Sequence, residues 1–373
     1  MTANQPLAHD LAPLLSGVDV VRHPDQLAPD VRDFLTQAEK RCPEFGFAWF
    51  SNLAATVYPG SEELRFYVLR RLGTVLAVLP LRAEKAGLGW TLHALGNFYT
   101  TLFEPQFAPQ CCTADLALLV ATMQADWPGL GALRLAPMDR TAPSYRLIID
   151  GIRAAGWQPY EFFSFGNWYQ PVSGSWSDYL AKRNGTLRNT IKRMTKKFSG
   201  DGGTLEIVTA GDDVARAVEA YEKVYASSWK QAEPYPEFIP GLARTCAEQG
   251  FLRLGLAWLN GRPIAAQLWI VTHDRAEIYK VAYDERFKAY APGTLLTALL
   301  MEHVIEVDKV TEVDYLIGDD PYKKTWMSHR RERWGIIAYN PRSLGGLAGW
   351  VREALGRQVK SVKARFTREV PHA

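Results

Sequence analysis

Two apolar runs joined by Asn260-Gly261 place the strongest constraint on what this chain can fold into. The runs, residues 251–259 and 263–271, have the composition of strands. Asn-Gly between such runs is the strongest short-range signal of a hairpin, because both positions of the tight turn need positive φ. A third strand-like run follows over residues 276–283. The sequence therefore predicts a hairpin with a third strand directly after it.

A Pro-Gly loop then leads from the third strand into a helix. The loop runs from Asp284 to Gly293, the helix from Thr294 to about Asp308, and a further strand follows over residues 312–317. The first turn of a helix leaves backbone N–H groups without partners inside the helix, and the helix dipole favours negative charge there. The loop therefore predicts a phosphate site and a nucleotide-containing cofactor, although most turns of this kind bind nothing.

This order of elements resembles the C-terminal half of GNAT-type N-acyltransferases. More narrowly, it resembles the bacterial CelD/BcsL type linked to cellulose and exopolysaccharide biosynthesis, which is related to the Fem-type transferases. The residues that carry the resemblance are Gly261–Ala266, Tyr283-Asp284, Ala291–Leu296, Asp314–Asp319, Tyr322-Lys323 and Trp326, and upstream Arg183, Arg188, Arg193 and Trp229. One departure is that Tyr290–Gly293 stands where ordinary GNAT enzymes carry a richer glycine loop.

The resemblance implies an α/β (α+β) fold of tandem GNAT-like domains, each a mixed, mostly antiparallel sheet flanked by helices. A chain of 373 residues is long enough for two domains, since single cores usually stop growing at about 250–300 residues. A hairpin-like pattern over residues 63–81 also recurs in the first half. We therefore expect an N-terminal GNAT-like domain over 1–165, an acyltransferase domain over 166–344 and a basic tail helix over 345–373.

Composition limits the classes of partner and the compartment. A net charge of +3 is too small to indicate nucleic-acid binding by itself. Four cysteines without metal-ligand spacing are typical of a reducing compartment. The first 17 residues lack the features of a signal peptide, and no run approaches the roughly 20 apolar residues of a membrane helix. The sequence predicts a cytoplasmic protein that needs no metal, with contact to the inner membrane as an open alternative.

The resemblance implies that acetyl-CoA or another acyl-CoA is the co-substrate. Backbone N–H groups at the end of the strand 276–283 are expected to hold the pantetheine arm and the oxyanion, and one such donor is worth about 10²–10³ in rate. The residues predicted to bind the cofactor are Val281, Ala282, Tyr283, Arg286, Tyr290, Ala291, Pro292, Gly293 and Thr294.

The catalytic candidates lie around the strand 312–317. Asp314 and Asp319 are candidate bases, because ligands gather at the ends of strands in open α/β sheets. Tyr283 and Tyr322 are candidate acids toward the leaving thiolate. The alternatives are that Asp319 serves only as a turn residue and that Tyr322 belongs to the core.

The substrate candidates begin in a basic run that predicts a helix from Trp176 to about Phe198. Arg183 and Arg188 in this run are expected to hold phosphates, with a solvated amphipathic helix as the alternative. Trp229 is expected to shape the acceptor pocket, although it also continues the apolar stripe of a predicted helix that begins at Asp212. Lys323 is a candidate for binding a phosphate or carboxylate.

The tail from Gly345 has an apolar side and a basic side, the latter containing Arg352, Arg357, Lys360, Lys363 and Arg365. Such a helix can dock on its own domain, which we favour, or lie on an anionic membrane.

Three functions follow from the resemblance. The first is an acyl-CoA-dependent N-acyltransferase, with acetyl as the expected group, that acts on an amine or hydroxyl of a small-molecule or lipid-linked sugar for the cell envelope or exopolysaccharide. The second is a Fem-type transferase that uses aminoacyl-tRNA, the one case in which we expect a nucleic-acid partner. The third is a GNAT-fold protein that binds without catalysis.

Overall fold

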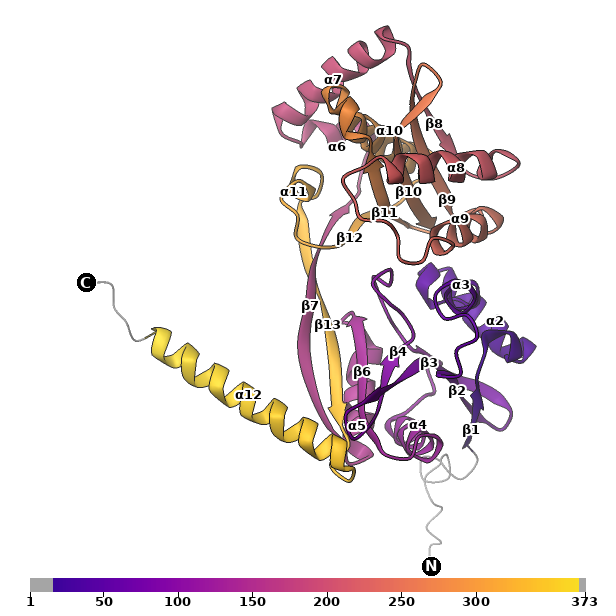
Figure 1. Ribbon diagram of the computed structural model, residues 1–373, viewed down its shortest axis with the longest axis vertical. Coiled ribbons are helices and arrows are strands. Elements are labelled where there is room, and N and C mark those ends of the chain that lie inside the picture. Colours follow the sequence, from indigo (N-terminus) through magenta and orange to yellow (C-terminus); the bar gives the residue numbers. More distant parts are fainter. Residues whose placement is uncertain (1–15, 369–373) are drawn as a thin grey trace, which may run out of the picture. The chain divides into compact units, whose positions relative to one another are not determined.

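The computed structural model describes residues 16–368, and the side chains of residues 16–358 (Figure 1). The chain forms two compact units. The first unit contains the chain up to Thr36, Ser61–Ser164 and the chain from Arg333, and the second contains Gln37–Gly60 and Phe165–Glu332. The expectations for residues 1–15 and 369–373 lie outside the described residues.

The first unit is built on a sheet with strand order β1-β2-β3-β4-β6-β13, in which β5 also pairs with β3. All of its pairs with a defined register are antiparallel except β4 with β6. Its elements are β1 Ser16–Val21, α2 Pro29–Glu39 (which ends in the second unit), β2 Leu64–Arg71, β3 Thr74–Ala86, β4 Gly89–Ala94, β5 Gln106–Phe107, α4 Thr113–Asp126, β6 Leu130–Met138, α5 Pro143–Ala154, β13 His329–Tyr339 (which begins in the second unit) and α12 Leu344–Arg368, with the short η2 Pro24–Gln26.

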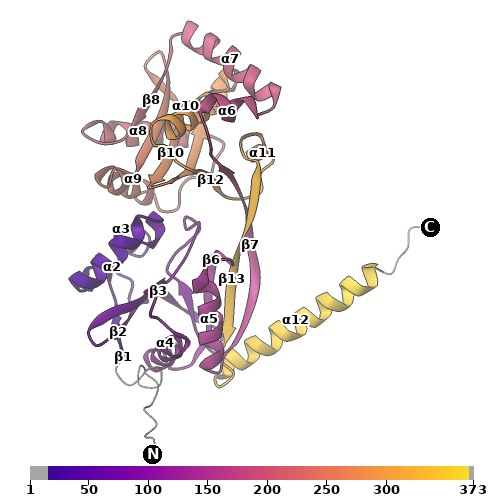
Figure 2. The same cartoon turned by 180° about the vertical axis from the view of Figure 1, so that it is seen from behind.

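The second unit contains the sheet β7-β12-β11-β10-β9-β8. Helices α10, α6 and α7 pack on one face of this sheet, and α8 and α9 pack on the other (Figure 2). Its elements are η3 Pro43–Phe45, α3 Phe47–Thr56, β7 Gln158–Pro171 (which begins in the first unit), α6 Trp176–Ala181, α7 Gly185–Gly200, β8 Gly203–Val208, α8 Asp213–Ala226, α9 Phe238–Glu248, β9 Leu252–Leu259, β10 Arg262–Thr272, β11 Arg275–Tyr283, η4 Glu285–Tyr290, α10 Pro292–Glu306, β12 Glu312–Ile317 and α11 Lys323–Trp326.

The predicted fold class is confirmed, because each unit is a mixed, mostly antiparallel sheet flanked by helices. The predicted hairpin joins β9 to β10, and its turn residues Asn260 and Gly261 both have positive φ, at 50° and 77°. The strand, Pro-Gly loop, helix and strand that follow are β11, η4, α10 and β12. Local turn and helix-start chemistry was sufficient to predict these elements.

Two predicted elements differ in the structure. The helix expected from Trp176 to Phe198 is broken into α6 and α7, because the Asn184 side chain accepts a hydrogen bond from the Leu187 N–H and begins a new helix. Residues 45–50 form an apolar and aromatic run whose pattern predicts a strand or loop, but Phe45 ends η3 and residues 47–50 lie in helix α3. A short apolar run does not distinguish a buried helix from a strand.

The compact units also differ from the contiguous division at residues 165 and 344. Residues 37–60 belong to the second unit, and the chain from Arg333 belongs to the first. Membership of a unit depends on packing between distant segments, which patterns along the chain do not report. No helix within residues 16–368 is both long and apolar enough to cross a membrane.

Candidate active site

The candidate site begins where β11 and β12 part. The two strands pair in parallel only over Arg275–Glu277 and Glu312–Asp314, whereas β10 continues to pair with β11 as far as Tyr283. Beyond Asp314, β12 turns at Leu316, which has a φ of 53°, and its register with β7 shifts there. The edge of β11 near Val281 is therefore left without a neighbouring strand on the β12 side.

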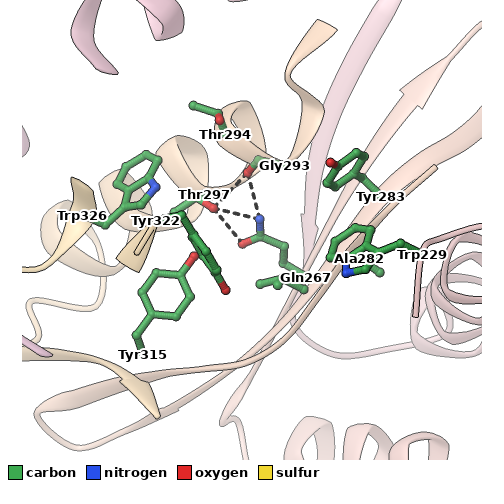
Figure 3. A pocket seen from close by; sticks show the side chains of 11 residues that line it. Trp229, Gln267, Ala282, Tyr283, Gly293, Thr294, Thr297, Tyr315, Tyr322 and Trp326 are labelled. Carbon is green, nitrogen blue, oxygen red and sulfur yellow. Dashed lines mark hydrogen bonds between the residues drawn. The ribbon is translucent and has the colours of Figure 1, made fainter. Parts of the chain in front are cut away.

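A cavity of about 350 Å³ lies at this parting (Figure 3). The end of β11, the first turn of α10 and the segment around α11 supply its walls. The lining residues are Trp229, Gln267, Val281, Ala282, Tyr283, Gly293, Thr294, Thr297, Tyr315, Tyr322 and Trp326. Most of the wall is aromatic or apolar, with a few polar groups, as is usual for small-molecule sites. The structure thus brings five of the predicted cofactor residues and two of the predicted acids together.

The first turn of α10 provides fewer free donors than the Pro-Gly pattern predicts. Ala291 adopts a left-handed conformation (φ 50°, ψ 46°), and its carbonyl accepts from the N–H groups of both Thr294 and Leu295. Pro292 has no N–H. Gly293 N–H alone among these groups makes no hydrogen bond within the described residues. The helix start can therefore offer one backbone donor and the helix dipole to an anion.

A polar network forms the floor of the cavity. The buried Gln267 side chain donates to the Gly293 carbonyl (2.9 Å) and to Thr297 Oγ1 (2.8 Å), and accepts from Trp269 Nε1 (3.0 Å). The Thr297 hydroxyl also donates to the Gly293 carbonyl (2.9 Å). These bonds hold the α10 start against β10. Neither Gln267 nor Thr297 is among the predicted residues, although an amide inside an apolar strand was a usable signal for Gln267.

Aromatic side chains frame the opening of the cavity. The Trp229 ring lies 4.7 Å from the Tyr283 ring and is half exposed, at 50 %, so it is a wall residue and does not continue the buried stripe of α8. Tyr322 meets Tyr315 edge to face at 5.5 Å. Burial raises the pKa of Tyr322 to about 12 and also raises the pKa of Tyr315. Both phenols therefore keep their protons at neutral pH and can act as donors.

Asp314 lies outside the lining of the cavity, in a buried hydrogen-bonded network. Its carboxylate accepts from Asn167 Nδ2 (2.5 Å), from the Leu316 N–H (2.7 Å) and from Arg331, which also pairs with Glu312 at 2.7 Å. The side chain is 1 % exposed. A carboxylate bonded in this way orders the β12 bulge and the neighbouring β7, and it has little capacity left to accept a proton from a substrate.

Asp319 and Lys323 also have hydrogen-bond or ion-pair partners within the protein. Asp319 pairs with Arg330 (2.6 Å) and accepts from Trp168 Nε1 (2.7 Å), and the hydrogen bond from Arg330 lowers the pKa of Asp319 to about 2. The buried Lys323 ammonium donates to the carbonyls of Tyr315, Ile317 and Gly318. These bonds make Asp319 a weak base, and they engage the Lys323 ammonium with backbone carbonyls of its own chain.

The remaining predicted residues lie around the site without lining it. Arg183 donates to the Trp326 carbonyl (2.9 Å) and so ties the end of α6 to the cavity wall, whereas Arg188 on α7 donates to Ala181. Arg286 pairs with Asp284 at 2.6 Å. The Tyr290 hydroxyl donates to Asp201 at 2.9 Å. Their predicted roles in binding stay predictions.

Lys230 is a further candidate that the sequence patterns do not single out. It directly follows the wall residue Trp229, and its ammonium lies 5.6 Å from the Tyr225 ring and 5.8 Å from the Trp229 ring. Within the described residues the ammonium has no hydrogen-bond or ion-pair partner, while the Lys230 backbone N–H donates to Ser228 Oγ at 3.3 Å. Burial, followed by the charge of Lys280, lowers the pKa of Lys230 to about 8. Glu233 acts against this shift, and so does Asp320 beside α11.

Among the described residues, no three His, Cys, Asp or Glu side chains gather closely enough to hold a metal ion.

A comparison with known protein families identifies the segment of the chain that contains the cavity. The profile of the acetyltransferase (GNAT) domain matches residues 185–324. The chain carries a GNAT acyltransferase domain. The match includes every residue that lines the cavity except Trp326, and it supports the predicted enzyme class. GNAT domains in general use an acyl-CoA co-substrate. The narrower assignment to the CelD/BcsL type stays a prediction.

Solved structures show the same fold at low sequence identity. The C-terminal domain of a protein described as a lysylphosphatidylglycerol synthetase, from Agrobacterium fabrum, is 13% identical with a TM-score of 0.52, over 87% of this chain and 96% of that one. FemX is 11% identical with a TM-score of 0.52, over 77% and 90%. A Bacteroides thetaiotaomicron protein of unknown function is 12% identical with a TM-score of 0.52, over 83% and 95%. No curated protein matches the sequence.

Proposed function

We propose that the protein is an acyl-CoA-dependent N-acyltransferase, with acetyl as the transferred group, whose acceptor is an amine or hydroxyl of a sugar-type precursor of the cell envelope or exopolysaccharide. The observation that carries the proposal is the cavity at the parting of β11 and β12, inside the segment that matches the GNAT profile. The acceptor is a small molecule or a lipid-linked sugar.

The residues present fit an acyl-CoA. The unpaired edge of β11 offers backbone groups to an extended chain, as a missing strand would. Gly293 leaves room at the helix start, since a Cβ built there meets only Tyr283, at 3.5 Å. When bound, the co-substrate supplies an activated thioester carbonyl. The backbone N–H groups of β11 that face the cavity would stabilise the oxyanion, each contributing about 10²–10³ in rate.

Lys230 is the residue that we propose takes the proton from the acceptor amine. A general base works best when its pKa is near the working pH, and the pKa of Lys230 is lowered to about 8. The two predicted bases are poorer, because Asp314 is fully bonded and the pKa of Asp319 is about 2. Lys230 has no partner that must first be displaced.

Tyr322 is the proposed acid toward the leaving thiolate. It lines the cavity, and its pKa of about 12 keeps the hydroxyl protonated. Tyr283, on the opposite wall, is another phenol that lines the cavity. The exposed face of Trp229 beside Tyr283 suits an acceptor that has both apolar faces and polar edges, which is a property of sugar rings.

Acetyl transfer to a panel of amino sugars and nucleotide-linked amino sugars tests this function. Release of the free thiol of coenzyme A is followed for the wild type and for Lys230→Ala, with Lys223→Ala on the exposed surface of α8 as the matched control. We expect turnover with at least one sugar amine in the wild type and the control. Acetyl-CoA binding without turnover on any sugar, together with turnover on a different class of amine, would reject the sugar acceptor.

A Fem-type reaction with aminoacyl-tRNA is the second candidate. Helix α7 favours it, because it exposes Arg188, Lys192, Arg193 and Lys196 while burying Leu187, Met194 and Phe198. Such a basic face can neutralise phosphates, and the affinity would then fall steeply with salt. Transfer of an amino acid from charged tRNA, with no transfer from acetyl-CoA, would favour this candidate over the first.

A further inference from the structure

Helix α12 carries an apolar stripe that its own unit leaves uncovered. Leu344, Leu347, Val351 and Leu355 are exposed to 77 %, 41 %, 47 % and 57 %. Their spacing of three, four and four residues places them along one side of a helix with about 3.6 residues per turn. Four large apolar side chains aligned in the open form a contiguous patch, whereas scattered exposed leucines are ordinary.

The opposite side of α12 makes the contacts with the first unit. Gly346 and Gly349 allow the close approach, because a Cβ on Gly346 would lie 2.1 Å from the Asn340 carbonyl oxygen and one on Gly349 would lie 2.6 Å from the Tyr339 ring. Trp350 Nε1 donates to the Tyr160 hydroxyl (2.8 Å), and Arg357 donates to the Glu161 carbonyl (2.8 Å). Both views show α12 meeting the strands of its unit toward its N-terminal end (Figures 1 and 2). Helix α12 therefore docks on its own unit through this opposite side, and the apolar stripe stays exposed to solvent.

The charge of α12 indicates which kind of surface the apolar stripe binds. The sequence of Leu344–Arg368 contains six basic residues and one acidic residue. Two copies of so basic a helix would repel each other. Four side chains also cover far less than the roughly 800 Å² per partner of a standard protein interface. An anionic lipid surface instead has an apolar acyl-chain region that can bury the stripe, and negative headgroups that attract the arginines and lysines.

We propose that α12 docks the protein on an anionic lipid surface, with Leu344, Leu347, Val351 and Leu355 inserted below the headgroups. The helix lies along the surface and does not cross it, in keeping with its mixed composition. This inference is independent of the acyl-transfer chemistry and would hold for any acceptor. A lipid-linked acceptor would, however, be concentrated on the same surface.

Vesicle sedimentation with the full chain tests the proposal. We expect binding to vesicles that contain phosphatidylglycerol, little binding to pure phosphatidylcholine, and weaker binding as salt shortens the Debye length from about 10 Å at 0.1 M. The triple variant Leu347→Gln, Val351→Gln, Leu355→Gln should bind the vesicles at least about tenfold more weakly than the wild type, because such binding scales with the apolar area inserted.

The control is Leu72→Gln, which changes a more exposed leucine (75 %) in the β2–β3 turn of the same unit and should leave vesicle binding unchanged. Thermal melting verifies that each variant folds. Three results would overturn the proposal: no binding to anionic vesicles, binding that the triple variant retains, or a wild-type dimer in solution that the triple variant dissolves.

Discussion

Two neighbouring parts of the second unit contain candidate catalytic side chains, and the two parts differ in how many hydrogen-bond and ion-pair partners those side chains already have. In the network around Asp314, the carboxylate is met by Asn167, Arg331 and a backbone N–H. Next to the cavity wall at Trp229, the Lys230 ammonium has no hydrogen-bond or ion-pair partner within the described residues, and the Tyr322 hydroxyl in the cavity keeps its proton. The comparison teaches that a saturated network stabilises the fold, and that groups with unused capacity are the ones available for chemistry.

The largest effect that would sharpen this comparison is on stability. Asp314→Ala removes one partner of a buried ion pair and should cost about 3–5 kcal/mol of unfolding free energy, because Arg331 loses part of its compensation. Urea denaturation measures the loss, and kcat per folded molecule should change little. A stable Asp314→Ala protein with kcat reduced by about 10²-fold or more would instead make Asp314 the base.

Changes at Lys230 test the other half of the comparison. Lys230→Ala and Lys230→Arg should each lower kcat by about 10²–10⁴-fold, since arginine keeps the charge but cannot accept the proton. A lysine is neutral above its pKa, so wild-type kcat should rise with pH and level off above about pH 8, and this rise should vanish in both variants. If Lys230→Arg retains full activity, Lys230 holds an anionic acceptor and is not the base.

Removal of one cavity hydroxyl should have a smaller effect. Tyr322→Phe deletes the proposed acid and keeps the ring, so we expect kcat to fall by about tenfold to 10²-fold with little change in melting temperature. Tyr169→Phe on β7, whose ring packs on Arg331 away from the cavity, is the matched control. Equal activity of Tyr322→Phe and the wild type would remove Tyr322 from the mechanism.

The smallest effect is expected at Asp319. Its pair with Arg330 lies on the surface, where solvent screens the attraction and ion pairs contribute little to stability. Asp319→Asn should therefore change kcat less than about threefold and leave the urea midpoint nearly unchanged. A loss of kcat comparable to that of Lys230→Ala would instead support Asp319 as the general base, as its position after a strand predicts.

The parts of the site that could be predicted are those encoded by neighbours in sequence. Asn260-Gly261 dictates its own turn, and Pro292-Gly293 marks a helix start, so both could be located from the chain alone. Whether a carboxylate is free depends on distant residues, since Asn167 lies 147 positions from Asp314. Helix α12 gives the same lesson, because a periodic pattern shows an apolar side but not which side packs.

The central claim is that the cavity beside Gly293 holds the acyl-CoA, and calorimetric titration with acetyl-CoA tests it most directly. Gly293→Trp places an indole in the cavity, while Gly200→Trp, at the end of α7 with open space around its Cβ, is the matched control. We predict comparable binding by the wild type and Gly200→Trp, and loss of binding in a folded Gly293→Trp protein. Undiminished binding by Gly293→Trp, or no binding by the wild type at millimolar ligand, would contradict the claim.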